Sequence, residues 1–266
     1  MPTVNVNNQV IHYEDSGGDG PALIFLHGFL FDQSMFDAQV EALQDAYRCI
    51  SVDTRGFGQT EWDGKAFDLY DIVADVIGLM DELGLEKPTI IGMSQGAYAS
   101  VRLAIKHPDR VKALVLMSTR KDIQSQEFNE NYKTLRDAWR EHGANEEMMN
   151  SLMFLLIGPQ ENFGDHWRNW RPKWSAFSGE HMYHTMNALL ARVPLTDDEI
   201  RQIEVPVLSI HGLADLGTPV ALADQLYELL PNGKGKVRVA GAAHAVSMTH
   251  PDEIIEPLRA FLDEYA

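Results

Sequence analysis

The stretch Gly92-Met93-Ser94-Gln95-Gly96 follows an apolar run, 88–91, and precedes a helix-forming segment, 97–106. A serine between two glycines at such a strand-to-helix corner is typical of a nucleophile elbow. The turn is so tight that the residues two before and two after the serine must be small, and Gly92 and Gly96 meet this need. The first amides of the following helix would point toward negative charge developing near the serine. The stretch therefore predicts Ser94 as a nucleophile at the carboxyl end of a strand.

Short apolar runs alternate with longer amphipathic segments on both sides of this corner. The expected strands are 4–6, 9–14, 22–26, 48–52, 89–91, 111–117, 207–210 and 236–239. The expected helices are 34–44, 69–83, 97–106, 219–230 and 252–265. This alternation predicts an α/β fold with a mostly parallel, eight-stranded sheet, helices on both faces, and ligands at the carboxyl ends of the strands.

Residues 122–196 interrupt the alternation, because they are helical in character and separate two expected strands. They contain many methionines and four of the five tryptophans, Trp139, Trp167, Trp170 and Trp174. We expect residues 122–196 to form a helical cap over a core domain made of 1–121 and 197–266. Most apolar side chains of this cap should pack against its own helices, and only a minority should face a ligand.

A serine hydroxyl is a weak nucleophile, so it needs a base within hydrogen-bond reach and a third group that orients the base. His244 lies in a loop of small residues, 241–245, directly after the last expected strand, and Asp215 follows the strand 207–210. Ser94, Asp215 and His244 are therefore the expected catalytic residues. An alternative is that Asp215 only shapes a helix start, with Asp122 as the acid in its place.

Two backbone amides should bind the negative oxygen that forms when the serine attacks a carbonyl. Gln95, directly after the nucleophile, would supply one amide. The other is expected from the loop after the strand 22–26, where we assign it to Phe29. Phe29, Phe31 and the Met and Trp content of 122–196 suggest an apolar pocket.

Composition narrows the possible partners. The formal net charge of −17 argues against nucleic acid or an anionic membrane surface, which would repel the chain. The N-terminus lacks the pattern of a secretory signal and no segment has the length of a membrane span, so a soluble, cytoplasmic protein is expected. Cys49, the single cysteine, lies in a strand-like run and is expected to be buried and inert. The oligomeric state is not indicated.

Other motifs are interpreted as structural. The ten histidines lack metal-ligand spacing, and Gly56-Phe57-Gly58 lacks the third glycine of a dinucleotide fingerprint. Asp53 is expected to be structural. His27 and His211, each beside a glycine at a strand end, are expected to make backbone hydrogen bonds that shape their loops.

The chain resembles α/β-hydrolases of the cap-bearing esterase, enol-lactonase and cofactor-free haloperoxidase branch. The resemblance is carried by His27-Gly28, Asp53-Thr54-Arg55-Gly56-Phe57-Gly58, Asp81-Glu82-Leu83-Gly84-Leu85, Gly92-Met93-Ser94-Gln95-Gly96, His107-Pro108-Asp109-Arg110-Val111, His211-Gly212 with Asp215, and His244. It implies an α/β-hydrolase fold, a serine mechanism and no cofactor. The chain departs from the family pattern at Ala97 and Ala243, where glycine is common, and at His250, where glutamate is common. Ser94 stands where dehalogenases have aspartate, which argues against dehalogenation.

These observations predict a serine hydrolase that cleaves a small-molecule carboxylic ester or lactone with a small to medium apolar acyl group through an acyl-enzyme. Perhydrolase or cofactor-free haloperoxidase activity, or hydrolysis of a carbon–carbon bond, would use the same triad. A non-catalytic ligand receptor on a hydrolase scaffold is the alternative from another class, although it would not need all of Ser94, Asp215 and His244.

Overall fold

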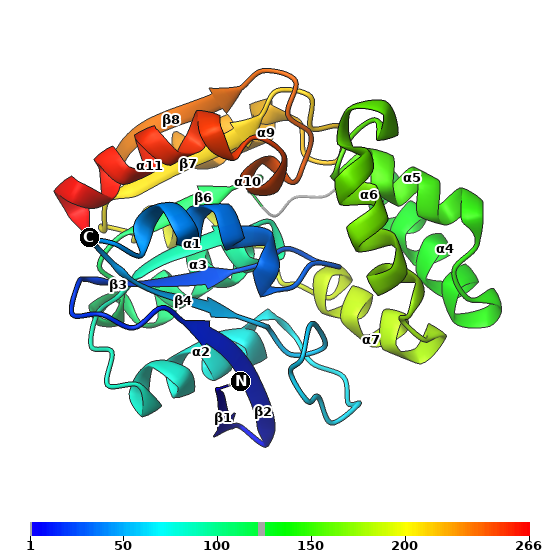
Figure 1. Ribbon diagram of the computed structural model, residues 1–266, viewed down its shortest axis with the longest axis horizontal. Helices are drawn as coiled ribbons and strands as arrows, with labels where there is room; N and C mark the ends of the chain where they lie inside the picture. The colour runs from blue at the N-terminus through cyan, green and yellow to red at the C-terminus, as the bar shows by residue number, and fades with distance from the viewer. Residues whose placement is uncertain (1, 122–125) are drawn as a thin grey trace.

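The computed structural model describes residues 2–121 and 126–266, which fold around one eight-stranded sheet (Figure 1). The strand order is β1-β2-β4-β3-β5-β6-β7-β8. Strand β2 pairs antiparallel with β1 and β4, whereas all other neighbours pair in parallel. The strands are β1 (Thr3–Val6), β2 (Gln9–Asp15), β3 (Ala22–Leu26), β4 (Arg48–Val52), β5 (Thr89–Met93), β6 (Leu114–Met117), β7 (Val207–Gly212) and β8 (Gly233–Val239).

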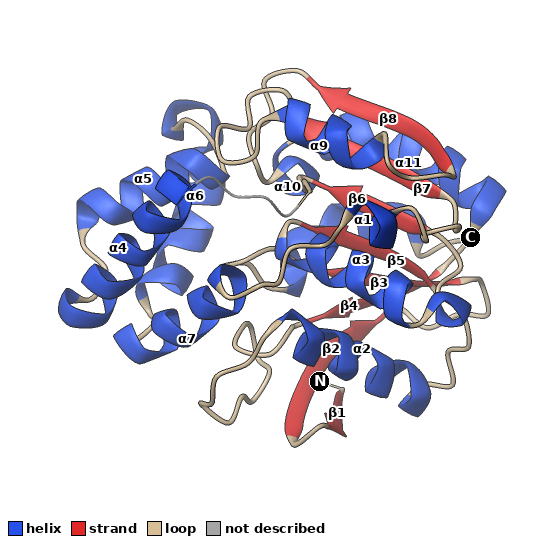
Figure 2. Ribbon diagram, turned by 180° about the vertical axis from the view of Figure 1, so that it is seen from behind, coloured by secondary structure: helices blue, strands red, loops and turns tan. Residues whose placement is uncertain are grey.

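Helices cover both faces of the sheet (Figures 1 and 2). α1 packs with α11 on one face, and α2 packs with α3 on the other. Every residue of β5, β6 and β7 is buried as a result, which explains why these strands are apolar without alternation. The α-helices and short 3₁₀ turns that surround the sheet are η1 (Gln33–Phe36), α1 (Asp37–Leu43), α2 (Leu69–Glu82), α3 (Gln95–Lys106), η2 (Pro108–Arg110), α9 (Val220–Tyr227), α10 (Val246–Thr249) and α11 (Pro251–Tyr265).

Four helices between β6 and β7 lie together at one side of the sheet, shown in green in Figure 1. We call them the helical insertion: α4 (Gln126–His142), α5 (Glu146–Leu156), α6 (Gln160–Ser175) and α7 (Gly179–Leu190). Within it, α4 packs against α7 and α5 against α6. The short helix α8 (Asp197–Ile200) leads back to β7. All four tryptophans of the insertion are buried, as are most of its methionines.

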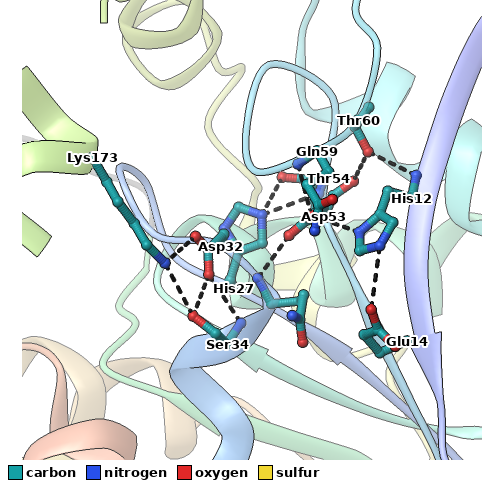
Figure 3. A network of polar contacts seen from close by, with 11 residues as sticks. His12, Glu14, His27, Asp32, Ser34, Asp53, Thr54, Gln59, Thr60 and Lys173 are labelled. Carbon is teal, nitrogen blue, oxygen red and sulfur yellow. Dashed lines mark hydrogen bonds and ion pairs between the residues drawn. The ribbon is translucent and has the colours of Figure 1, made fainter. Parts of the chain in front are cut away.

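Aromatic and polar contacts join the insertion to the loops that follow β3 and β4. The ring of Phe31 packs edge-on against Trp170 and Trp174, at centroid distances of 4.9 and 5.4 Å. Lys173 Nζ lies 2.7 Å from Asp32 Oδ2 (Figure 3). His181 Nε2 donates to Gly56 O at 2.5 Å. The insertion is thereby fixed to two loops at the carboxyl edge of the sheet.

Several element boundaries differ from the sequence prediction by one to three residues, and the structure explains three of these differences. The strand expected at 111–117 begins only at Leu114, because Val111 and Ala113 follow the η2 turn and are buried without being part of the strand. The helix expected at 34–44 is split into η1 and α1 at Phe36, whose φ of −105° and ψ of 8° are not helical. The helix expected at 219–230 begins after Pro219, which is extended, and ends at Tyr227.

A buried network around Asp53 fixes the loops after β3 and β4 (Figure 3). Asp53 Oδ1 accepts from the Gln33 amide at 2.8 Å, and Oδ2 accepts from the Gln59 amide and from His12 Nδ1 at 2.9 and 2.8 Å. His27 Nδ1 donates to Gly28 O and Nε2 accepts from the Thr54 amide. Burial lowers the pKa of His27, which keeps its ring neutral. The structural interpretation of Asp53 and His27 agrees with these contacts.

Gly58→Ala should destabilise the fold through this network. Gly58 has a φ of +58°, and a Cβ there would lie 2.1–2.3 Å from the carboxyl atoms of Asp53. The Asp53 carboxylate would have to move and lose hydrogen bonds while buried, at a cost of roughly 1–3 kcal/mol for each group left unpaired. Gly64 is the matched control, because its φ is +76° but a Cβ would meet nothing within 4 Å. We expect urea unfolding to show a loss for Gly58→Ala at least about 2 kcal/mol larger than for Gly64→Ala; equal losses would contradict this account.

Candidate active site

Ser94 stands at the tight turn between β5 and α3, with φ 49° and ψ −109°. This conformation is strained for a residue with a side chain, and it is held by the Ser94 amide donating to Met117 O of β6 at 2.9 Å. A Cβ at Gly96 would lie 2.0 Å from Leu26 O, and one at Gly92 would lie 2.5 Å from Ser100 Oγ. The two glycines therefore permit the close approach of backbones that the sequence motif predicted.

The parallel register brings the residues after β5, β7 and β8 to one edge of the sheet. Gly92 pairs with Leu116, Met117 with Ile210, and Gly212 with Val239, so the carboxyl ends of these strands lie at similar levels. At that edge His244 Nε2 lies 2.9 Å from Ser94 Oγ. His244 Nδ1 lies 2.6 Å from Asp215 Oδ2. The structure thus brings together the three side chains expected from the sequence, although Ser94 and His244 are 150 residues apart.

Two contacts that the sequence did not reveal position the His244 loop. Ser118 Oγ donates to His244 O at 2.6 Å, from a buried residue with φ 48° directly after β6. The Ala245 amide donates to Leu156 O, the last residue of α5, at 2.7 Å. Ser118 could have been proposed from its place directly after a strand. Nothing in the sequence indicates that Leu156 contacts the loop of His244.

The Asp215 carboxylate is buried, and each of its two oxygens has a hydrogen-bond partner. Burial by itself would raise the pKa of this carboxyl, but the charge of His244 and hydrogen bonds from His211, His244 and the Thr218 amide together hold the pKa below its usual value. Asp215 is therefore ionised and can orient the His244 ring and stabilise an imidazolium. His211 Nε2 also donates to Thr218 O at 2.6 Å, so it shapes this loop as expected.

The phenylalanine and glutamine assigned to the oxyanion site lie on adjoining segments. The Gly96 amide donates to His27 O at 3.1 Å, which joins the start of α3 to the loop that carries Phe29. Phe29 packs edge-on against Phe57 at 5.8 Å. Within the described part of the chain, neither the Phe29 amide nor the Gln95 amide has a hydrogen-bond partner. Both amides are thus available to a ligand oxygen.

A cavity of about 40 Å³ lies next to Ser94 and His244. Its other walls come from α3, the chain after β6, the loop 217–218 and three helices of the insertion: Tyr98, Arg120, Tyr132, Leu155, Leu156, Leu189, Leu190, Arg192, Gly217 and Thr218. Arg120, Arg192 and both tyrosines were not predicted from the sequence. Phe29 and Phe31, which suggested an apolar pocket, are not among the residues that line this cavity: the ring of Phe31 packs against Trp170 and Trp174, and the ring of Phe29 packs against Phe57.

Cys49 is a buried residue of β4 and does not line this cavity. Burial raises the pKa of Cys49 to about 12, as expected for an inert thiol. Asp122, the alternative acid, lies outside the described residues. Among the residues that the structure describes, no three His, Cys, Asp or Glu side chains are arranged to hold a metal ion. In those same residues no helix has the length and apolarity needed to cross a bilayer.

Fold and site together define a hydrolase class, and comparisons with known proteins agree. A family model described as alpha/beta hydrolase fold matches residues 21–251, and the chain belongs to this family. It is 28% identical to the pimeloyl-[acyl-carrier protein] methyl ester esterase of Nitrosomonas europaea, over 92% of this chain and 96% of that protein. The crystal structure of the enol-lactonase from Burkholderia xenovorans LB400 superposes with a TM-score of 0.90 at 25% identity, covering 98% of this chain and 100% of that one.

A thermophilic esterase from Thermogutta terrifontis shares the fold, with a TM-score of 0.88 at 24% identity over 99% of this chain and 98% of the other. The α/β-hydrolase fold with inserted helices and the resemblance to esterases and enol-lactonases are therefore confirmed. The protein is a hydrolase that acts on a small molecule.

The ionised Asp215 should make stability depend on pH. A carboxyl whose pKa is lowered in the folded state stabilises the fold above its unfolded pKa of about 3.9, and this contribution is lost as the pH falls through the folded value. The difference in unfolding free energy between wild type and Asp215→Asn should therefore be constant near pH 7 and shrink below about pH 5. Urea unfolding between pH 7 and pH 3 measures it, with the exposed Asp19→Asn as a control for losing a surface carboxylate. A difference that grows on acidification would contradict the assignment.

Proposed function

We propose that this chain is a serine hydrolase that cleaves carboxylic esters or lactones through an acyl-enzyme. The observation that carries the proposal is the continuous line of hydrogen bonds from Asp215 through His244 to Ser94, with distances of 2.6 and 2.9 Å. Such a line supplies a base for the hydroxyl and an anion that steadies the resulting imidazolium. The relatives named for ester and enol-lactone chemistry support this reaction class.

In the first half of the reaction, Ser94 Oγ bonds to the substrate carbonyl carbon while its proton passes to His244 Nε2. The carbonyl π electrons move onto the oxygen, which accepts hydrogen bonds from the amides of Phe29 and Gln95. When the tetrahedral intermediate collapses, the bond to the alcohol oxygen breaks and that oxygen takes the proton from His244. Water then repeats these steps on the acyl-enzyme, and the acid is released.

The cavity favours a small or medium acyl group with an apolar portion. Four leucines of the insertion form much of its wall, and their side chains can contact methylene groups: Leu155, Leu156, Leu189 and Leu190. The cavity is small, about 40 Å³, which favours a short acyl chain beside Ser94 over a long one. In this proposal residues 122–196, which contain the helical insertion, act as a cap that closes the acyl side of the site over a core of 1–121 and 197–266.

Ser94→Ala should abolish turnover of short-chain methyl and aryl esters, because no other group replaces the nucleophile. Loss of a serine nucleophile lowers kcat roughly 10⁴- to 10⁶-fold in comparable triads. A fluorophosphonate probe followed by peptide mass spectrometry should modify Ser94 in the wild type and leave the variant unmodified.

Ser51→Ala is the matched control, since Ser51 is buried in β4 and, among described residues, its Oγ has no hydrogen-bond partner. It should retain wild-type turnover. Ester hydrolysis at the wild-type rate by Ser94→Ala would overturn the serine mechanism, and modification of Ser94 without any turnover of esters or lactones would favour a ligand receptor.

A further inference from the structure

A groove of about 410 Å³ lies between α4 and α5 of the helical insertion. α4 packs mainly against α7 and α5 against α6, which leaves room between α4 and α5. The walls of the groove are mostly apolar, and no step of the proposed reaction uses it. They comprise Asn131, Tyr132 and Leu135 of α4, Asn145 at the start of α5, and Glu147, Met148, Ser151, Leu152 and Leu155 of α5.

The groove and the cavity beside Ser94 share part of their walls. Tyr132 and Leu155 line both spaces, and among the described residues they are the only two that do so. The cavity is much the smaller space, at about 40 Å³. The two spaces are therefore neighbours, with these two side chains between them. We call Tyr132 and Leu155 the dividing pair.

Leu155 stands where α5 meets the loops of the triad. Its side chain lies beside Gly217, since a Cβ at Gly217 would be 3.6 Å from Leu155 Cγ and Cδ1. Gly217 is two residues beyond Asp215, and the residue after Leu155, Leu156, accepts a hydrogen bond from the Ala245 amide at 2.7 Å. The end of α5 thus contacts both loops that carry the base and its orienting acid, which keeps Leu155 in the wall of the cavity.

Tyr132 completes the shared wall from α4. Burial raises the pKa of its hydroxyl to about 12, so the side chain is neutral near pH 7. Leucine and tyrosine are both large, and neither carries a charge here. What the dividing pair presents to a ligand is therefore bulk and not charge.

An acyl chain bound to Ser94 lies next to this wall, because Ser94 lines the same cavity. A short chain fits within the cavity, whereas a longer one can reach the apolar groove only if the dividing pair is displaced, at the energetic cost of overpacking. We propose that Tyr132 and Leu155 are specificity-determining residues that set the upper length of the acyl chain. The proposal rests on the proposed serine mechanism, which attaches the acyl carbon to Ser94.

A series of p-nitrophenyl esters tests the proposal. We expect the wild-type kcat/KM to be at least roughly tenfold lower for the octanoate than for the butyrate. In Leu155→Ala the cavity would open into the groove, where each buried methylene favours binding by a factor of roughly four. The octanoate-to-butyrate ratio should therefore rise at least roughly tenfold in this variant. Tyr132→Ala should raise the ratio as well, and Tyr132→Phe, which keeps the ring, should leave it at the wild-type value.

Leu190→Ala is the matched control for Leu155→Ala. Both leucines are half-buried and line the Ser94 cavity, but Leu190 does not line the groove. Its truncation removes the same atoms without joining the two spaces, so the ratio should change by no more than the roughly fourfold effect of one methylene.

A charge placed in the groove shows where the longer chain lies. Met148 is half-buried and lines the groove but not the cavity. Met148→Glu should leave the wild-type ratio unchanged, because the acyl chain stays in the cavity. Combined with Leu155→Ala, the same substitution should cancel the gain for the octanoate, since the apolar chain would then desolvate a carboxylate.

A second readout does not depend on turnover. A fluorophosphonate with an ethyl group on phosphorus should modify wild-type Ser94 faster than one with an octyl group, and Leu155→Ala should remove this difference. Equal wild-type kcat/KM for butyrate and octanoate, or equal gains in Leu155→Ala and Leu190→Ala, would overturn the role of the dividing pair and leave the serine mechanism intact. Failure of both probes to modify Ser94 would instead count against the serine mechanism itself. Since the wild-type measurements are decisive, the test stands even if a variant fails to fold.

Discussion

The close passage of the backbone at Gly96 is the constraint on which the site depends. A Cβ at this position would lie 2.0 Å from Leu26 O, so only glycine lets α3 begin directly against the end of β3. That closeness holds Ser94 at φ 49° and sets the Gln95 amide beside the loop that carries Phe29. The hydrogen bond from the Gly96 amide to His27 O joins the two segments. Strain at the nucleophile is thus supported by the buried sheet around it.

The helical insertion also fixes two loops at the same edge of the sheet. Trp170 and Trp174 enclose Phe31, and Lys173 pairs with Asp32, so α6 fixes the loop after β3. Leu156 at the end of α5 accepts from the Ala245 amide and fixes the loop that carries His244. The insertion therefore supports both sides of the site, in addition to lining the cavity beside Ser94.

Much of this could be predicted from the sequence because the signals are local. Strands β3 and β4 were predicted with their observed ends, since apolar runs of the right length are bounded by polar or turn-forming residues. The approach of Ser94, Asp215 and His244 followed from their places after three strands of one parallel sheet. The start of β6 was missed because Val111 is apolar through burial and not through strand pairing.

The cavity wall was not predictable in the same way. Arg120 and Arg192 approach from opposite ends of the insertion, and no spacing in the sequence links them. Phe29 and Phe31 stand close to the expected oxyanion site in sequence, yet their rings pack against Phe57 and the tryptophans of α6. The packing of the insertion helices against the sheet determines which side chains line the cavity, and the sequence does not reveal this packing.

The most direct test of the central claim is a crystal structure of the protein after reaction with an alkyl phosphonate ester, whose tetrahedral phosphorus mimics the intermediate of acyl transfer. The account predicts a covalent bond from Ser94 Oγ to phosphorus, His244 Nε2 beside the position of the departed alcohol, and a phosphonyl oxygen about 2.7–3.1 Å from the amides of Phe29 and Gln95. An adduct on another residue, or a phosphonyl oxygen that faces away from both amides, would contradict it.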